Sequence, residues 1–219
     1  MSEPEDGLFG QIKDKLIAAK QKWAREGRLL TGKSGAGRLP PGQRLVRDWP
    51  VLDLGLQPLV ATLDAGLTVD GLVAAPLTLD WEEFLALPQT DEVSDIHCVT
   101  AWSRYDNHWR GVRAQTLLDR VRPEPAARFV VFHSHDGYTT NVSLERFAAP
   151  DVLLAHSWEG RPLTREHGGP LRVVMPRYYF WKSAKWLKRI EFRDQDQPGF
   201  WEVRGYHNVG DPWREQRYG

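Results

Sequence analysis

The stretch Val93-Ser94-Asp95-Ile96-His97-Cys98-Val99-Thr100-Ala101-Trp102-Ser103 contains the only cysteine of the chain. The alternation of apolar and polar residues before Cys98 predicts a strand that runs into a loop at this residue. A lone cysteine cannot form an intrachain disulfide, so Cys98 is either a small buried apolar residue or a group with a chemical role. The stretch alone leaves both interpretations open, and the choice depends on residues elsewhere in the chain.

The composition is that of an ordinary globular protein. Of the 219 residues, 41% are hydrophobic and 26% are charged, which is enough for a core of its own. The 29 basic and 29 acidic residues cancel, so no overall field attracts nucleic acid or a membrane surface. No apolar run is long enough to span a membrane. The N-terminus lacks the apolar core of an export signal, and a single cysteine fits a reducing compartment, so we expect a cytoplasmic protein.

Residues 1–43 are predicted to form an amphipathic helix followed by a flexible connector. Apolar residues recur at helical spacing over residues 7–26, with lysines and arginines on the other face. Such a helix can pack on its own domain, on a membrane surface or in the groove of a partner, and we favour its own domain. Residues 27–34 match the pattern of a phosphate-binding loop, but the glycines and prolines that follow cannot open the helix that this loop needs.

Residues 44–219 are predicted to form one α+β domain. The expected strands are a pair around the turn Asp70-Gly71 and the segments 129–133, 138–142, 152–156, 171–175 and 186–192. Short helices are expected at 81–87, with Asp80 and Glu83 as a capping box, and at 112–121. The order contains no regular βαβ units, which favours mixed sheets with short helices. The aromatic tail, residues 198–219, is expected to wrap the surface.

Two stretches besides His97-Cys98 concentrate reactive side chains: Arg165–Arg172 and Lys182–Lys185. Each has a plain structural alternative, because a histidine can cap a strand or satisfy a loop and a lysine can be a solvated charge. The two lysines, however, are surrounded by tyrosine, phenylalanine and tryptophan. Amines in such surroundings usually meet an anion. Together these residues favour a ligand that carries a phosphate.

The same residues resemble a known family. Arg165-Glu166-His167-Gly168-Gly169-Pro170-Leu171-Arg172-Val173-Val174-Met175-Pro176 is similar to a His-Gly-x-Pro-x-Arg-x-Val-x-Pro element of the sulfite oxidase family of molybdopterin oxidoreductases. Lys182-Ser183-Ala184-Lys185-Trp186-Leu187 is similar to its Lys-Trp-Leu run, and the order and spacing relative to Cys98 also match. From about Arg44 to Trp213 the chain resembles the small bacterial members of this family.

The resemblance implies the α+β molybdopterin-binding fold and a molybdenum–molybdopterin cofactor. Cys98 corresponds to the cysteine whose thiolate binds molybdenum, while the pterin dithiolene supplies two further sulfurs. The residues that the resemblance places against the cofactor are His97, His167, Arg172, Lys182, Ser183 and Lys185. The catalytic residues that it implies are Tyr138 near the oxo ligand of the metal, with Arg47 and Arg104 on the side of the substrate.

The chain departs from sulfite oxidases at Ser103, where they carry an arginine, and Arg104 follows one position later. We therefore predict an enzyme that transfers an oxygen atom to or from a small oxyanion, sulfoxide or N-oxide. Its partners would be that small molecule and an electron donor or acceptor. Three alternatives stay open: a zinc or other metal site of Cys98 with His97, His133 or His135, a Cys–His hydrolase, and a non-catalytic carrier of the molybdenum cofactor or interaction protein on the same fold.

Overall fold

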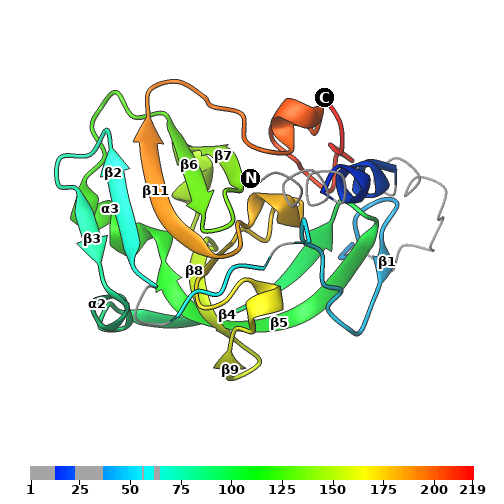
Figure 1. Cartoon of the computed structure of the whole chain (residues 1–219), viewed down its shortest axis with the longest axis horizontal. Helices are drawn as coiled ribbons and strands as arrows, with labels where there is room; N and C mark the ends of the chain where they lie inside the picture. Colours follow the sequence, from blue (N-terminus) through cyan, green and yellow to red (C-terminus); the bar gives the residue numbers. More distant parts are fainter. Residues whose placement is uncertain (1–12, 23–36, 56, 62–64) are drawn as a thin grey trace, which may run out of the picture.

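The computed structural model describes residues 13–22, 37–55, 57–61 and 65–219. Within these residues the chain forms two sheets that lie beside one another (Figure 1). The larger sheet has the order β1-β5-β8-β10, with β4 paired to β5 and β9 paired to β8. Its strands are β1 (Arg44–Leu45), β4 (Gln89–Cys98), β5 (Trp102–Arg113), β8 (Leu153–Trp158), β9 (Arg161–Pro162) and β10 (Arg172–Val174).

The smaller sheet has the order β3-β2-β11-β6-β7. Its strands are β2 (Leu67–Gly71), β3 (Leu77–Leu79), β6 (Phe129–Ser134), β7 (Thr139–Ser143) and β11 (Leu187–Arg193). The helices are short: α2 (Trp81–Leu85), α3 (Ala114–Val121), α4 (Leu144–Phe147) and the 3₁₀ turns η3 (Arg165–His167), η4 (Phe180–Lys182) and η5 (Glu202–Arg204). Parallel and antiparallel pairs occur in both sheets, which confirms the predicted α+β class with mixed sheets.

The strand predicted before Cys98 is β4, and it pairs with β5 in a long antiparallel hairpin. Strand β5 was not predicted, and the helix expected from residue 112 begins only at Ala114. Along β5 buried and exposed positions alternate, but Asn107 and Gly111 occupy buried positions beside Trp109. A polar and a small residue on the inner face hide the apolar alternation that identifies a strand. Gly111 is needed there, because a Cβ atom would lie 2.1 Å from the carbonyl oxygen of Leu154.

The strand pair expected around Asp70-Gly71 exists as β2 and β3, but the turn lies elsewhere. Gly71 is the last residue of β2 and pairs with Phe192 of β11, and β3 begins at Leu77. The Asp70-Gly71 dipeptide is typical of a turn, but Gly71 has another role. Its positive φ of 87° suits a glycine and lies at a point where two strands approach closely. A Cβ atom at this position would lie 2.2 Å from the carbonyl oxygen of Phe192.

Two clusters of buried side chains form the core. The first lies under the smaller sheet and α3 and is mostly aliphatic, with Leu67, Leu117 and Ile190 among its members. The second lies beside the β4–β5 hairpin, is rich in tryptophan and includes Cys98. The tail lies outside both sheets (Figure 1), but the prediction that it wraps the surface is only partly right, because Trp201 and Tyr206 are buried in this second cluster. Part of the tail therefore belongs to the core, while other residues such as Val203 and Trp213 are exposed.

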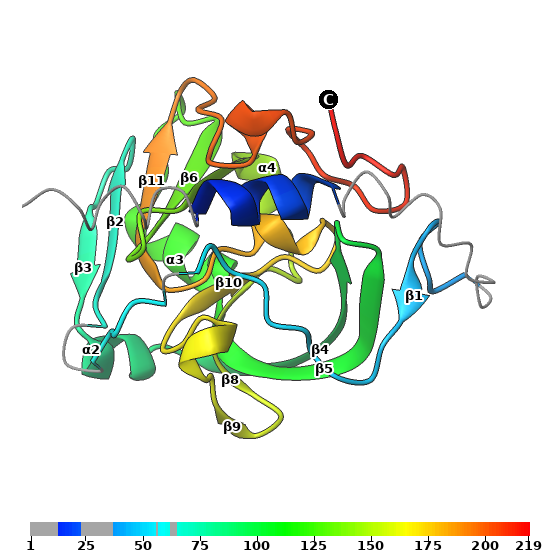
Figure 2. The same ribbon diagram turned by 45° about the vertical axis from the view of Figure 1, so that its right-hand side comes forward.

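Residues 13–22 are helical, within the helix predicted for residues 7–26. Figure 2 shows this N-terminal helix lying across the molecule between β11 and the β4–β5 hairpin. Its buried residues Ile17 and Lys20 face the rest of the chain, which agrees with packing on its own domain. The phosphate-loop pattern at residues 27–34 lies outside the described residues. Gln43, at the end of the expected connector, is buried, and the domain boundary itself stays a prediction.

The capping box of α2 is present as predicted, because Asp80 accepts from the amide of Glu83 and Glu83 accepts from that of Asp80. We expect Asp80→Ala to lower the free energy of unfolding by about 1 kcal/mol, since it leaves an amide of the first turn without its acceptor. Urea titration followed by circular dichroism measures the change. Glu82→Ala on the same turn is the control, and an equal loss in both variants would contradict the capping role.

Candidate functional site

A cavity of about 120 Å³ opens where β4 ends, next to the buried tryptophan cluster. Six of the ten residues that the sequence singled out line it: Cys98, Tyr138, His167, Arg172, Ser183 and Lys185. They come from four separate segments, which the two sheets bring to one place. The walls between them are largely aromatic, with Trp49, Trp181 and Trp201 among them.

Cys98 is the last residue of β4 and is buried. Its Sγ lies 3.1 Å from the Oγ1 of Thr100, and Gln43 donates a hydrogen bond of 3.1 Å to its carbonyl oxygen. Burial raises the pKa of the thiol, while the hydrogen bonds from Thr100 and the charges of Lys20 and Arg217 act in the opposite direction. The thiol is therefore held neutral until a group that prefers thiolate, such as a soft metal, binds it.

Arg172 is fully buried and has no ion-pair partner among the described residues. Its guanidinium donates to the carbonyl oxygens of His167 at 2.7 Å and Ser183 at 2.9 Å, and it lies 4.3 Å above the ring of Phe180. Burial lowers the pKa of Arg172 to about 9. A buried cation that meets only carbonyl oxygens and aromatic faces fits a bound anion in the cavity.

Lys185 lies in the same cavity and donates to the carbonyl oxygen of Glu166 at 2.6 Å. Burial, followed by repulsion from Arg172, lowers the pKa of Lys185 to about 7. Gly168 makes room for this lysine, because a Cβ atom there would lie 2.8 Å from the Lys185 side chain. The two cations thus fit the phosphate-bearing group that the sequence indicated.

His167 is stacked on Trp49, with ring centroids 4.0 Å apart. Its Nδ1 lies 2.9 Å from the hydroxyl of Thr164, and its Nε2 lies 3.2 Å from the carbonyl oxygen of Trp49. Burial lowers the pKa of His167, so the ring is neutral. A neutral ring that donates from Nε2 and accepts at Nδ1 satisfies both contacts, and it leaves the imidazole fixed at the wall of the cavity.

Tyr138 and Ser183 complete the predicted set inside the cavity. The Tyr138 hydroxyl donates to the carbonyl oxygen of Trp181 at 2.6 Å, and burial keeps its pKa well above the usual value. The Ser183 hydroxyl accepts from the amide of Met175 at 3.0 Å. Both hydroxyls are neutral, positioned groups in the cavity wall.

Lys182 and His97 do not line the cavity. Lys182 has no exposed side-chain surface, and its Nζ lies 2.6 Å from the Oε1 of Glu202. It therefore belongs to an internal ion pair rather than to an anion pocket. The Nδ1 of His97 lies 2.8 Å from the Oγ of Ser103, on the other side of the strand from Cys98. Successive residues of a strand point to opposite faces. The side chain of His97, the residue before Cys98, therefore points away from the Cys98 side chain.

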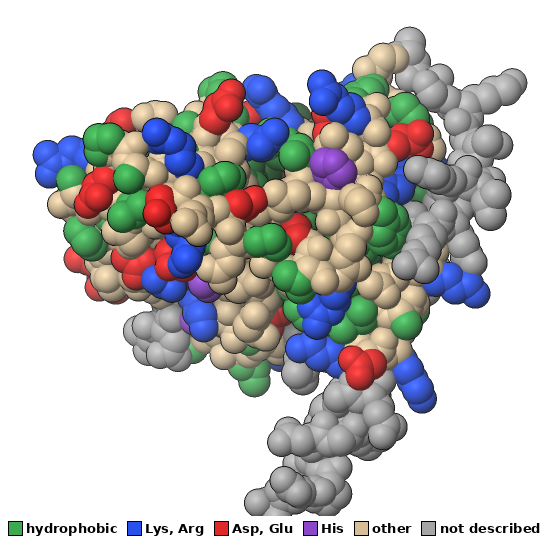
Figure 3. All heavy atoms as spheres, turned by 90° about the horizontal axis from the view of Figure 1, so that it is seen from above, with side chains coloured by type: hydrophobic (Ala, Val, Ile, Leu, Met, Phe, Trp, Pro, Cys, Tyr) green, Lys and Arg blue, Asp and Glu red, His purple; other side chains and the backbone are tan. Residues whose placement is uncertain are grey.

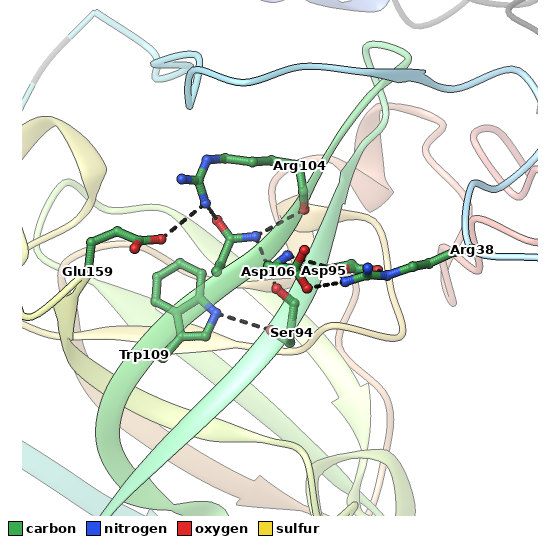
Figure 4. A network of polar contacts seen from close by, with 8 residues as sticks. Arg38, Ser94, Asp95, Arg104, Asp106, Trp109 and Glu159 are labelled. Atoms are coloured by element: carbon green, nitrogen blue, oxygen red, sulfur yellow. Dashed lines mark hydrogen bonds and ion pairs between the residues drawn. The ribbon is translucent and has the colours of Figure 1, made fainter. Parts of the chain in front are cut away.

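The predicted substrate arginines, Arg47 and Arg104, also lie outside the cavity. Arg104 bonds to Asn107 and lies 3.3 Å from Glu159 (Figure 4). Its guanidinium also lies 4.7 Å from the centre of the Trp158 ring. Its Nε donates to the carbonyl oxygen of Arg47 at 3.0 Å, and the Arg47 side chain is exposed. Arg104 is thus committed to this surface network, and its role toward a substrate stays a prediction.

Sequence reasoning missed several residues of the cavity, above all Lys20, Asp53 and Asp136. Lys20 was assigned to the basic face of the N-terminal helix. The spacing of Lys20 from Ile17 could have indicated its place in the cavity, because residues three apart lie on the same face of a helix. Asp53 and Asp136 lie in loops, where no periodic pattern indicates which way a side chain points.

Comparisons with known proteins identify the family of the chain. The model of the oxidoreductase molybdopterin binding domain matches residues 57–201. The chain is 47% identical over 184 residues to an uncharacterized oxidoreductase, YuiH, of Bacillus subtilis, covering 84% of this chain and 93% of YuiH. The chain belongs to the sulfite oxidase family of molybdopterin oxidoreductases. It is accordingly an oxidoreductase that uses a molybdenum–molybdopterin cofactor, as the sequence predicted.

Other relatives of this molybdopterin oxidoreductase are longer. The chain is 29% identical to the catalytic subunit MsrP of a protein-methionine-sulfoxide reductase of Ralstonia nicotianae, covering 66% of this chain and 48% of MsrP. Among solved structures, the sulfane dehydrogenase SoxCD of Paracoccus pantotrophus matches with a TM-score of 0.59 at 22% identity, covering 64% of this chain and 40% of that one. This likeness confirms the fold.

Two further observations bear on the alternatives. In the described part of the chain, no three His, Cys, Asp or Glu side chains are arranged to hold a metal ion, whereas an ordinary zinc site takes at least three such ligands. Among the same residues, no helix is long and apolar enough to cross a membrane. On the face seen in Figure 3, basic and acidic side chains are interspersed.

The low pKa of Lys185 gives a prediction for the cofactor-free protein. The pKa of lysine in an unfolded chain is about 10.4, so the unfolded state holds more protons than the folded one between about pH 7 and pH 10. The free energy of unfolding should therefore rise with pH across this window. Urea titrations at several pH values should show the rise in the wild type and a flatter profile in Lys185→Met. The exposed Lys188→Met is the control, and a wild-type profile unchanged by Lys185→Met would contradict the assignment.

Proposed function

We propose that this oxidoreductase transfers an oxygen atom to or from a small substrate, with molybdenum bound by the Cys98 thiolate and the pterin dithiolene. The observation that carries the proposal is that Cys98 shares one cavity with the buried cation Arg172 and the half-buried cation Lys185. A thiolate suits molybdenum, and the two cations suit the phosphate of the pterin. The cofactor supplies the two-electron chemistry of the transfer.

The residues of the chain would divide the remaining work. Arg172 and Lys185 bind the phosphate, while His167 and Ser183 hold fixed positions beside them. Tyr138, whose hydroxyl donates to the carbonyl oxygen of Trp181, is the side chain of the cavity wall that we place next to the substrate. The tryptophans of the wall exclude water, which strengthens these polar contacts.

The substrate class that we favour is a sulfoxide, followed by N-oxides and small oxyanions. The sulfoxide is supported by the name of the MsrP relatives and by Ser103, which stands where sulfite oxidases carry an arginine. Ser103 is buried against His97 and Gln43, so it does not replace that arginine. Sulfoxide reduction also requires an electron donor.

The experiment that tests the proposal is a measurement of molybdenum and released pterin per chain. The protein would be purified from a host that makes the cofactor, and we expect close to one of each. Zinc alone, or no metal and no pterin, would overturn the proposal. Assays with dimethyl sulfoxide, trimethylamine N-oxide and sulfite then separate the enzyme from the carrier. Bound cofactor without turnover of any of the three would favour the non-catalytic carrier. The cytoplasmic location stays a prediction, which cell fractionation would test.

A further inference from the structure

The N-terminal helix closes one side of the Cys98 cavity. Ile17 packs into the same buried cluster as Cys98, and Lys20, one turn later, lines the cavity itself. In Figure 2 the helix lies across the molecule rather than away from it. Only 9% of Lys20 is exposed, so its amine does not reach bulk water freely.

Contacts along the helix fix its position on the tail. The Tyr218 hydroxyl donates to the carbonyl oxygen of Gln21 at 2.8 Å, and the Gln21 amide donates to that of Arg204 at 3.3 Å. At the other end, the amine of Lys13 lies 5.5 Å from the ring of Phe200. These contacts hold the N-terminal helix against the tail, and this position directs Lys20 into the cavity.

The amine of Lys20 is only partly satisfied. It donates to the carbonyl oxygen of Asp53, and no carboxylate of the described residues forms an ion pair with it. Burial lowers the pKa of Lys20, while the charge of Asp53 opposes this effect. An ammonium group has three donors, and among the described residues only the carbonyl oxygen of Asp53 accepts from it, so two donors can meet a ligand in the cavity.

The charges around the cavity leave an excess of cations. Arg172, Lys185 and Lys20 face two carboxylates, Asp53 and Asp136. Asp53 is already engaged by the Gln57 side chain at 2.7 Å and by the amide of Gly55 at 2.9 Å. Asp136 accepts from the amide of Tyr138 at 3.0 Å, and burial raises its pKa. Neither carboxylate therefore neutralises Lys20 through a direct contact.

Other cations near Cys98 are turned away from the cavity. Arg217 donates to the carbonyl oxygen of Val99 and lies 5.0 Å from the ring of Tyr179, outside the cavity lining. Arg104 is held by the surface network described above.

We propose that Lys20 is an anion-binding residue of the Cys98 cavity, brought there by the N-terminal helix. Its ligand is a negatively charged or strongly polar oxygen, either on the phosphate of the cofactor or on the substrate. Lys20 thus supplies the positive charge that Arg104 and Arg47 do not bring into the cavity. This inference rests on the proposed function and assigns a further binding residue to the same site.

The test compares Lys20→Met with Lys15→Met, an exposed lysine on the same helix. Three quantities are measured on each purified protein: molybdenum and pterin per chain after gel filtration, the KM and kcat for dimethyl sulfoxide, and the affinity for inorganic sulfate by calorimetry. A hydrogen bond to a charged group accounts for about a tenfold to hundredfold change in affinity. We expect a loss of that size in Lys20→Met and none in Lys15→Met.

The measurements distinguish the two sources of the oxygen. Loss of cofactor from Lys20→Met identifies the phosphate, whereas retained cofactor with a raised KM and little change in kcat identifies the substrate. Lys20→Arg keeps the charge and should retain most of the wild-type behaviour, which separates lost charge from a displaced helix. If Lys20→Met matches Lys15→Met in all three measurements, the inference is wrong. Sulfate affinity can be measured without the cofactor. If the wild-type protein contains no molybdenum, the proposed function is refuted, while the sulfate affinities of the variants still test the role of Lys20.

Discussion

Cys98→Ser should remove oxygen-atom transfer while leaving the protein folded. Cys98 is buried beside Thr100 in a turn, and a serine fits the same space. Its hydroxyl ionises far less readily than a thiol and gives a harder ligand, so the metal loses the thiolate that tunes it. Loss of outer contacts alone lowers activity by about 10- to 100-fold, so loss of a ligand should lower kcat by at least about a hundredfold.

The measurement is turnover per bound molybdenum together with the visible absorption spectrum of the loaded protein. Thr100→Val is the matched control, because it removes the 3.1 Å contact to Sγ and keeps the thiol. Its spectrum should stay close to that of the wild type. Unchanged turnover in Cys98→Ser would show that the thiolate is not a ligand, even if the protein contains molybdenum.

The second large effect is expected at Glu202, far from Cys98 in sequence. Its Oε1 accepts from Thr140 and from the indole of Trp181, both at 2.9 Å, and lies 2.6 Å from the amine of Lys182. Glu202→Leu leaves Lys182 as a buried charge without its partner. Breaking a buried pair in this way lowers the free energy of unfolding by about 3–5 kcal/mol. Urea titration measures the loss.

A double variant checks the physical reason. Lys182→Met combined with Glu202→Leu removes both charges, so it should recover much of the stability lost in Glu202→Leu. Asp91→Asn is the surface control, because its partner Arg110 is half exposed and such pairs contribute under about 1 kcal/mol. A double variant no more stable than Glu202→Leu would show that packing, rather than the unpaired charge, causes the loss.

Glu202 also connects the stability of the fold to the site. It holds the indole of Trp181, and the carbonyl oxygen of Trp181 accepts the hydrogen bond from Tyr138. The tail residues 198–219 therefore position the cavity wall as well as covering it. The sequence alone predicts a tail that wraps the surface, and no local pattern in it points to Tyr138.

Much of the architecture could be predicted from local patterns. The apolar strands β6, β8 and β11 lie within one or two residues of their predicted ranges, and the capping box at Asp80 predicted the start of α2. Each depends on neighbours in sequence, which is why periodicity and cap residues reveal it. Strand β5 could not be predicted from the sequence, because its inner face includes the polar Asn107 and the small Gly111. The presence of these residues there is explained only by packing against neighbouring strands.

The sequence by itself determined the family, the α+β class and the association of Cys98 with Arg172 and Lys185. These follow from motifs whose residues are close together or keep a fixed order. The tertiary structure decided which similar side chains serve the site: Lys185 lines the cavity, whereas Lys182 pairs with Glu202. It also brought Lys20 into the cavity from a distant helix. The direction of a side chain and its ion-pair partner depend on segments that meet only after folding. Local sequence patterns therefore do not indicate either of them.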